Sequence, residues 1–247
     1  PVNRRQRQMC IRDRYFFIII GILSCADKNS LFEELSPFRT GVKFSNDLAY
    51  DETFNIFTYR NYYNGGGVGL GDINNDGLID IFFNSNLEKN RLYLNKGDFK
   101  FEDITDFAGV AGTKSWSTGV SIADINADGF LDIYVSNSGD IKGDNKQNEL
   151  YINNGDLTFT EMAADYGLDD TGYSTHAAFF DYDRDGDLDC YLLNNSYKGG
   201  FRITNIGTNQ RPIRDSVGGD KLFRNDDGYF NDVSEESGIY GLSLIHI

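Results

Sequence analysis

The chain of 247 residues has few basic residues, two His, three Cys and three Pro. Lys and Arg number 23 against 38 Asp and Glu, which gives a formal net charge of -15. That balance argues against nucleic-acid binding, because such affinity comes from Lys and Arg that neutralise phosphates. His246 lies in the C-terminal tail and His176 in a strand-like run, where we expect it to pack or cap rather than act as a base. No Ser-His-Asp arrangement can be assembled, so the sequence predicts a protein that is not an enzyme.

The scarcity of cysteine excludes a disulfide framework. Cys10 lies in a terminal segment discussed below, and Cys25 ends an apolar run. Cys190, in "LDCYLL", has the surroundings of a buried strand thiol. The fold must therefore be held together by packing, with metal ions as a further candidate.

No apolar run is long enough to cross a bilayer as a helix. Residues 15–25, "YFFIIIGILSC", match the apolar part of a signal peptide. The end "ILSC" resembles a bacterial lipobox, which predicts lipidation of Cys25, a membrane anchor through that lipid, and an outer-membrane, cell-surface or periplasmic location. An ordinary secretory signal with an incidental Cys25 is the alternative. Residues 26–66 would then hold a polar tether and an N-terminal strand.

Both ends of the chain look foreign to the rest. Residues 1–14, "PVNRRQRQMCIRDR", and residues 242–247, "LSLIHI", resemble translated sequencing-adapter sequence. A natural basic leader and a natural apolar tail are the alternative. The first interpretation predicts that the natural protein continues beyond this chain.

Glycine, with 27 residues, and aromatic residues, at 14%, are abundant, which favours short strands joined by tight turns. Three similar units follow one another at residues 67–112, 117–170 and 174–240. The loops "DINNDGLID", "DINADGFLD" and "DYDRDGDLD" recur in them, beginning at Asp72, Asp124 and Asp181. Agreement in loop, strand and turn marks these units as structural repeats.

Each repeat predicts four short strands. One precedes the acidic loop, as in "TGVSIAD", and one follows it, as in "DIFFN". A third, as in "RLYLN", leads through a Gly turn to a fourth, as in "KFEDI". Only short segments such as "ITDFAGV" and "EMAADYG" could form single helical turns. The predicted fold class is all-β: a β-propeller of four-stranded antiparallel blades.

Three blades do not close a ring, so the chain is expected to be part of a larger propeller. Residues 31–46, "LFEELSPFRTGVKFSN", resemble the fourth-strand region of the first repeat. They are expected to form the strand that closes the last blade. Residues 47–63 have no clear place in this scheme.

The acidic loops predict three cation sites. Oxygen-bearing side chains stand at alternate positions around Gly77, Gly129 and Gly186, and carboxylates so close repel one another unless a cation lies among them. Oxygen ligands in a flexible loop suit Ca²⁺. The expected ligands, counting the backbone carbonyl at the seventh position, are Asp72, Asn74, Asp76, Leu78 and Asp80; Asp124, Asn126, Asp128, Phe130 and Asp132; and Asp181, Asp183, Asp185, Asp187 and Asp189. The alternative is a solvated turn without metal.

These loops differ from an EF-hand, which needs Glu at position 12. The sequence holds Phe83, Val135 and Leu192 there, each inside a predicted strand. A bound ion would therefore join the first two strands of each repeat.

The D-x-[DN]-x-D-G-x-x-D loops between strands of blades about 50 residues long resemble FG-GAP and VCBS-type repeats, which form the seven-bladed propeller of integrin α subunits and of many bacterial surface proteins. The order of motifs resembles bacterial secreted propellers that carry a C-terminal ASPIC/UnbV domain. The resemblance covers residues 31–240 and implies Ca²⁺ in the loops and a binding or adhesion scaffold. The Phe-Gly and Gly-Ala-Pro signatures of integrin blades are absent.

Long insertions at residues 138–148 and 196–219 connect the second and third strands, and so lie at the edge opposite the acidic loops. The second insertion carries Lys198, Arg202, Arg211 and Arg214. It is a candidate contact for an acidic protein or an anionic glycan, or simply a solvated loop. The enzymatic alternative is a Ca²⁺-dependent polysaccharide lyase, with Lys198 or Arg202 beside the metal.

Overall fold

The computed structural model describes residues 31–59, 62–114, 116–139, 145–195, 214 and 216–239. The chain divides into two units, residues 1–36 and residues 37–247, and all the strands described here belong to the second. The predictions for residues 1–30, including the signal peptide and Cys25, lie outside the described residues, as do those for residues 242–247.

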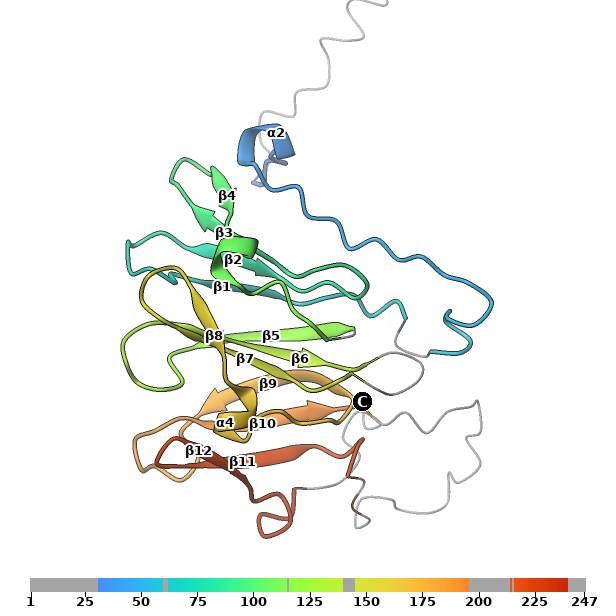
Figure 1. Cartoon of the computed structure of the whole chain (residues 1–247), viewed down its shortest axis with the longest axis vertical. Coiled ribbons are helices and arrows are strands. Elements are labelled where there is room, and N and C mark those ends of the chain that lie inside the picture. The colour runs from blue at the N-terminus through green and yellow to red at the C-terminus, as the bar shows by residue number, and fades with distance from the viewer. Residues whose placement is uncertain are drawn as a thin grey trace, which may run out of the picture. The chain divides into compact units, whose positions relative to one another are not determined.

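Within the described residues, twelve strands form three four-stranded antiparallel sheets (Figure 1). The first sheet has the order β1 (Val68–Gly71), β2 (Asp80–Phe83), β3 (Arg91–Asn95), β4 (Phe101–Asp103). The second has the order β5 (Ser117–Ala123), β6 (Asp132–Asn137), β7 (Glu149–Asn153), β8 (Phe159–Glu161). The third has the order β9 (Ser174–Phe180), β10 (Asp189–Asn194), β11 (Lys221–Asp226), β12 (Tyr229–Asp232). The predicted all-β class and the four strands of each repeat are confirmed.

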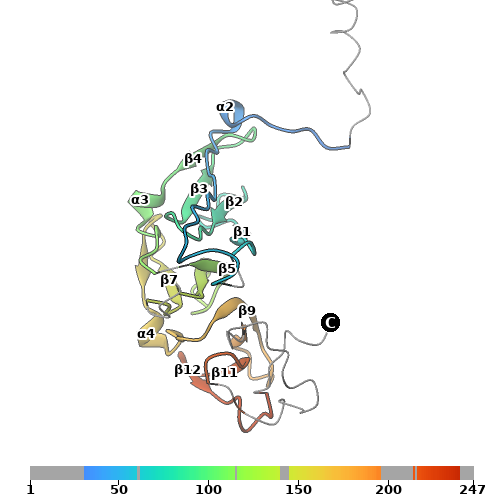
Figure 2. The same ribbon diagram turned by 90° about the vertical axis from the view of Figure 1, so that its right-hand side faces the viewer.

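The sheets stack so that β1, β5 and β9 lie side by side (Figure 2). One apolar core joins the first and second sheets and includes Phe82, Ile133 and Val135. Another joins the second and third and includes Tyr134, Leu150 and Leu192. Each sheet therefore buries a face against its neighbour, the arrangement that stabilises successive blades.

Small residues on the inner strands let adjacent sheets approach closely. A Cβ added at Gly69 would lie 2.8 Å from Ile122 Cδ1, and one at Gly119 would lie 2.3 Å from the Thr175 carbonyl oxygen. The glycines of the run "GGGVGLG" thus let β1 pack closely against β5. Ser121 adds a hydrogen bond from its Oγ to the Ala177 carbonyl at 2.5 Å.

Two single helical turns, α3 (Thr105–Ala108) and α4 (Ala163–Tyr166), lie on the other side of the sheets (Figure 2). Each ends at a glycine with positive φ, Gly109 or Gly167. A Cβ at Gly167 would come within 2.7 Å of the Phe230 carbonyl oxygen in the following sheet. The turns predicted after the fourth strands are confirmed, and α4 contacts the sheet of the next repeat.

Residues 31–46 form no strand, which differs from the expected closing strand. Pro37–Thr40 forms the short helix α2, and the chain then runs along the first sheet. There Phe44 stacks on Phe83 with ring centroids 4.8 Å apart, and the Lys43 N–H donates to the Tyr93 hydroxyl. The physical reason is that this segment contacts the first sheet through the Phe44 ring and the Tyr93 hydroxyl instead of through a backbone ladder.

Residues 47–63, which the sequence could not place, contribute to an aromatic cluster. Tyr59, Tyr62 and Trp116 are buried together, with Phe54 and Leu48 against them. The ring centroids of Tyr59 and Trp116 lie 5.0 Å apart in an edge-to-face arrangement. This satellite core packs at the start of β5.

Cys190 is fully buried on β10, as predicted. His176 is exposed on β9 and lies beside β5 of the second sheet, where its Nδ1 would be 2.8 Å from a Cβ added at Gly119.

Gly119→Ala should lower the free energy of unfolding by about 2 kcal/mol, because the new methyl group would meet backbone atoms of β9 that cannot move aside. The matched control is Gly69→Ala, where the methyl group meets side-chain atoms of Ile122 and Val120 and no backbone atom among its nearest neighbours. Urea unfolding followed by tryptophan fluorescence measures both. Equal losses in the two variants would contradict the close approach of β5 and β9.

Candidate metal centre

The three acidic loops, residues 72–80, 124–132 and 181–189, connect the first and second strands of each sheet and lie at the left edge of the sheets in Figure 1. Gly77, Gly129 and Gly186 have φ of 85°, 91° and 104°, a backbone conformation that other residues rarely adopt. The sequence therefore folds each loop into a tight turn around its glycine.

Hydrogen bonds to the first Asp close the first two loops. Asp72 accepts from the N–H groups of Asp76 and Gly77 at 3.0 and 2.8 Å. Asp124 accepts from Asp128 and Gly129 at 3.0 and 2.9 Å. Asn at the third position donates its side-chain amide to the fifth-position carboxylate: Asn74 to Asp76, and Asn126 to Asp128.

The third loop has Asp183 in place of that Asn, so the amide donor is replaced by another acid. Carboxylate oxygens of Asp181, Asp183 and Asp189 all lie within 4.8 Å of one another. Asp187 Oδ1 is buried and has no hydrogen-bond partner. Desolvation and the neighbouring Asp185 carboxylate raise the pKa of Asp183, and the same causes raise the pKa of Asp187 to about 6. The repulsion among these groups is therefore unrelieved.

A hard divalent cation fits this donor set, since several carboxylate oxygens converge and one buried oxygen lacks a donor. The first two loops fit a cation less completely. The side-chain nitrogens of Asn74 and Asn126 donate to the carboxylates of Asp76 and Asp128, whereas a cation in the loop would need an oxygen there. Asp76 accepts an N–H bond from Leu78, and Asp128 accepts one from Phe130, each at 2.8 Å. Leu78 and Phe130 therefore lie within the loops as predicted. Their carbonyls, and that of Asp187, stay predicted ligands.

The ninth-position residues Asp80, Asp132 and Asp189 have a structural role that the sequence did not reveal. Each is buried, and each accepts an N–H bond from the second residue of its loop, namely Ile73, Ile125 and Tyr182. The other oxygen accepts from the N–H of an Asn on the third strand. In all three repeats both carboxylate oxygens are therefore engaged by backbone, which makes Asp80, Asp132 and Asp189 anchors of the fold first and candidate ligands second.

Burial is the main reason that the pKa of Asp80 is raised and that the pKa of Asp132 is raised to about 6. The two backbone N–H bonds to each carboxylate act in the opposite direction. The nearby loop carboxylates add to the rise.

The Asn partners of these carboxylates were missed by sequence reasoning. Their side-chain amides donate to the carbonyl just before the anchoring Asp, as Asn95 does to Ile79 at 2.8 Å. The same bond recurs in the other repeats, from Asn153 to Leu131 and from Asn225 to Leu188. The signal available in the sequence was an Asn at the end of the third strand, or one residue before its end, in every repeat.

The opposite edge of each sheet has its own polar anchor, also missed. Asn90, Asn148 and Asp220 each precede a third strand and accept, through Oδ1, an N–H bond from the end of the second strand. Asn90, Asn148 and Asp220 occupy matching positions in the three repeats. The signal available in the sequence was therefore a side chain that can accept a hydrogen bond just before each third strand.

Of the four basic residues predicted to meet a partner, Lys198, Arg202 and Arg211 lie outside the described residues. Arg214 is described and bonds to Asp232 at 2.6 Å and to Glu235 at 3.4 Å. The Arg214 guanidinium therefore already forms ion pairs with carboxylates of this chain.

Comparison with known proteins also identifies repeats in this chain. A model of the FG-GAP-like repeat matches residues 72–135 and 138–192. Cartilage acidic protein 1 of Xenopus tropicalis is 33% identical over 144 residues, which are 56% of this chain and 21% of that protein. Cartilage acidic protein 1 of Homo sapiens is 28% identical over 169 residues, 67% of this chain and 24% of that protein.

These matches support a propeller-type protein built of FG-GAP-like repeats, distantly homologous to cartilage acidic protein 1. The chain spans about a quarter of the length of these relatives. Within the described ranges, no helix has the length and apolar character needed to cross a membrane.

Asp132→Ala should lower the free energy of unfolding by about 3 kcal/mol in EDTA, because two buried backbone N–H groups lose their charged acceptor. Asp128→Ala in the same loop is the matched control, since its side chain is exposed, and its loss should be under about 1 kcal/mol. Urea unfolding in EDTA measures both. Equal, small losses would mean that Asp132 acts only as a metal ligand.

Proposed function

We propose that this protein is a calcium-binding, non-catalytic propeller scaffold of the cell surface or periplasm that binds a protein or glycan partner. The observation that carries the cation part is the third acidic loop, where three carboxylates converge and a buried Asp187 oxygen lacks a donor. The recurrence of the loop in all three FG-GAP-like repeats supports one site per repeat.

Asp181, Asp183, Asp185 and Asp189 would hold the ion in the third loop, together with the Asp187 carbonyl. The first and second loops would use Asp72, Asn74, Asp76 and Asp80, and Asp124, Asn126, Asp128 and Asp132, with the Leu78 and Phe130 carbonyls. A bound Ca²⁺ would supply positive charge that offsets carboxylate repulsion and fixes each loop between two strands.

Sites for a partner are favoured at the opposite edge of the sheets, where the long connections lie. The FG-GAP-like repeats and the distant homology to cartilage acidic protein 1 support a scaffold. The lyase alternative depends on Lys198 or Arg202, outside the described residues, and no described residue favours it.

The finer parts of the proposal come from the sequence resemblance alone. They are a relationship to VCBS-type bacterial secreted propellers with an ASPIC/UnbV domain, export by the segment 15–25, and a lipid anchor at Cys25. Mass spectrometry of the membrane fraction after expression in a bacterium, with Cys25→Ser as control, tests the anchor.

Calcium should raise the melting temperature of the full chain. A ligand that binds only the folded state stabilises it by about 2.7 kcal/mol for each site at a hundredfold excess over Kd. Differential scanning calorimetry in EDTA and in millimolar Ca²⁺ measures the change, and equilibrium dialysis gives the number of ions bound.

The double variant Asp181→Asn, Asp183→Asn should bind one ion fewer and gain less stability from Ca²⁺. Its matched control is Asp98→Asn, which removes an acid from a turn outside the loops. Identical melting curves of the parent in EDTA and in Ca²⁺ would contradict the proposal.

A further inference from the structure

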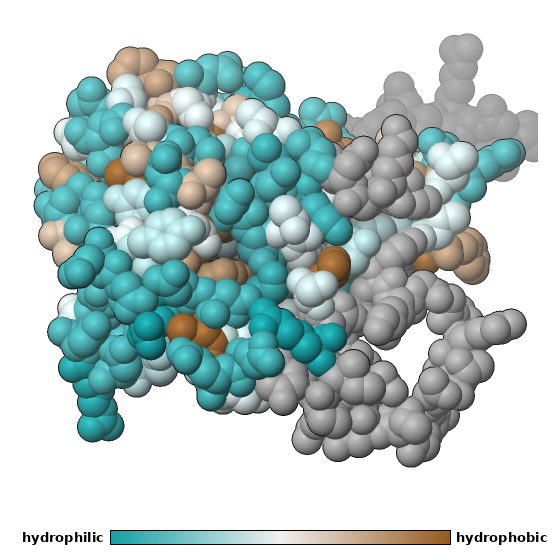
Figure 3. Space-filling view, turned by 60° about the horizontal axis from the view of Figure 1, so that its bottom comes forward, coloured by the Kyte–Doolittle hydropathy of each residue, from teal (hydrophilic) through white to brown (hydrophobic). Residues whose placement is uncertain are grey.

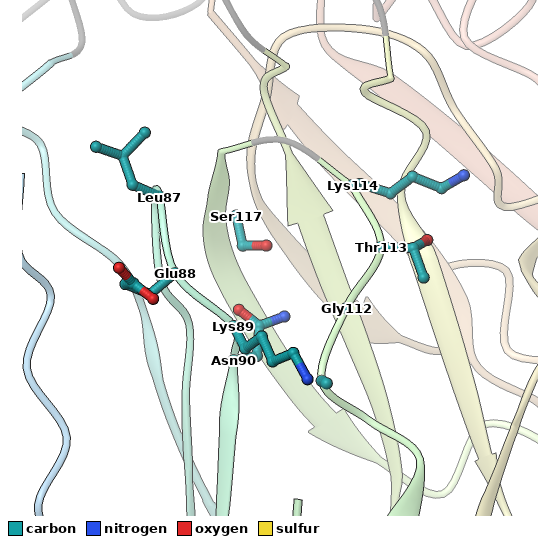
Figure 4. Close-up of a pocket in the computed structure, with 9 residues that line it drawn as sticks. Leu87, Glu88, Lys89, Asn90, Gly112, Thr113, Lys114 and Ser117 are labelled. Atoms are coloured by element: carbon teal, nitrogen blue, oxygen red, sulfur yellow. The ribbon is translucent and has the colours of Figure 1, made fainter. Parts of the chain in front are cut away.

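A cavity of about 240 Å³ lies at the edge of the sheets opposite the acidic loops. Residues 87–90, which connect β2 to β3, form one wall, and residues 111–114 with Ser117, which lead into β5, form the other (Figure 4). The cavity thus lies between the first and second repeats. It is smaller than the usual pocket for a drug-sized ligand, which favours a single side chain or a similar small group.

Asn90 gives the cavity a buried hydrogen-bond donor without a partner. Its Oδ1 accepts from the Ser85 N–H at 2.9 Å, which fixes the orientation of the amide. Its Nδ2 has no hydrogen-bond partner, although Asn90 is only 2% exposed. A Cβ placed on Gly112, across the cavity, would lie 2.8 Å from this nitrogen, so only glycine leaves room there.

The equivalent residues of the other repeats have partners, which shows that the free donor is particular to the first repeat. Asn148 donates its amide to the Tyr134 hydroxyl at 2.9 Å and to Ser174 Oγ at 3.0 Å. Phe82 stands where the second repeat has Tyr134, so the hydroxyl acceptor is missing. Asp220 in the third repeat is an acid and accepts from the Tyr191 hydroxyl. A buried donor left unpaired is costly, and an acceptor atom brought by a ligand would remove that cost.

The charges around the cavity favour one negative charge. In Figure 4 the Lys89 ammonium points toward Gly112, whereas the ends of Glu88 and Lys114 point away from the Asn90 amide. Lys89 is exposed and its ion pair with Asp106, at 3.5 Å, is a weak surface contact that a ligand can replace. The buried Glu149 carboxylate lies behind the wall and accepts from the Thr113 N–H and hydroxyl. Its charge opposes a doubly charged anion such as phosphate.

We propose that this cavity binds one carboxylate group, supplied by a Glu or Asp side chain of an acidic protein segment, through the Asn90 amide and the Lys89 ammonium. No aromatic side chain of the described residues lines the cavity on which a sugar ring could stack, so a peptide is favoured over a uronic acid. The inference rests on the proposed scaffold role, because it names the chemistry of the partner. It does not depend on bound calcium.

Titration of the ¹⁵N-labelled full chain with acetyl-Gly-Glu-Gly-amide, followed by NMR, tests the proposal. Saturable shifts of the Asn90 side-chain amide and the Gly112 backbone are expected. The same titration with acetyl-Gly-Gln-Gly-amide should show affinity about tenfold lower, since a charged acceptor is lost.

Asn90→Asp should weaken binding of the Glu peptide about tenfold or more, because it removes the donor and adds a negative charge. The fold should persist, since Asp220 fills this position in the third repeat and still accepts the strand-end N–H. Asn154→Asp, which adds the same charge in an exposed turn at the other edge, is the matched control and should leave affinity unchanged.

Equal affinity for the Glu and Gln peptides, or no effect of Asn90→Asp, would overturn the proposal. Saturation by glucuronate without saturation by the Glu peptide would overturn the choice of a peptide. The melting experiments with calcium separate this proposal from the cation sites. If the melting temperature depends on calcium but the Glu peptide does not bind, only the cavity proposal is rejected. If the Glu peptide binds but the melting temperature does not depend on calcium, only the cation sites are rejected.

Discussion

One buried carboxylate at the end of each acidic loop holds the surrounding sheet in register. It accepts an N–H bond from the start of the loop and another from the third strand, so loop, second strand and third strand meet at one side chain. An aspartate removed from water in this way is stable only because both oxygens are bonded. The three repeats reproduce this arrangement at Asp80, Asp132 and Asp189. Any cation in the loop would be added to a turn that already has its shape.

The repeats are joined by contacts as well as by chain connections. Asn75 donates to the Gly129 carbonyl at 3.0 Å and so bonds two neighbouring loops directly, and Asn153 on β7 donates to the Ile73 carbonyl of the first loop at 2.8 Å. The close approach of β1, β5 and β9 adds apolar packing at the other side of the same loops. The two kinds of contact explain why the acidic loops of successive repeats lie along one edge.

The sequence predicted the strands and the loops well because both depend on local patterns: alternation, Gly turns and repeated spacing. It could not show that the ninth Asp is an anchor, since that role depends on Asn95 or Asn153 some 15 to 21 residues further along. It could not place residues 47–63, because their aromatic side chains pack on Trp116 from the next repeat. Residues 31–46 were expected as a strand from local similarity, although a strand forms only where its backbone pairs with another strand, and here the segment meets the first sheet through side chains.

The single thiol within the three sheets, Cys190, is fully buried, and burial raises its pKa. The sheets contain no second sulfur to which it could be joined. Their native state is therefore reached without any oxidation step, and a glutathione-buffered medium and an oxidising one should give the same folded repeats.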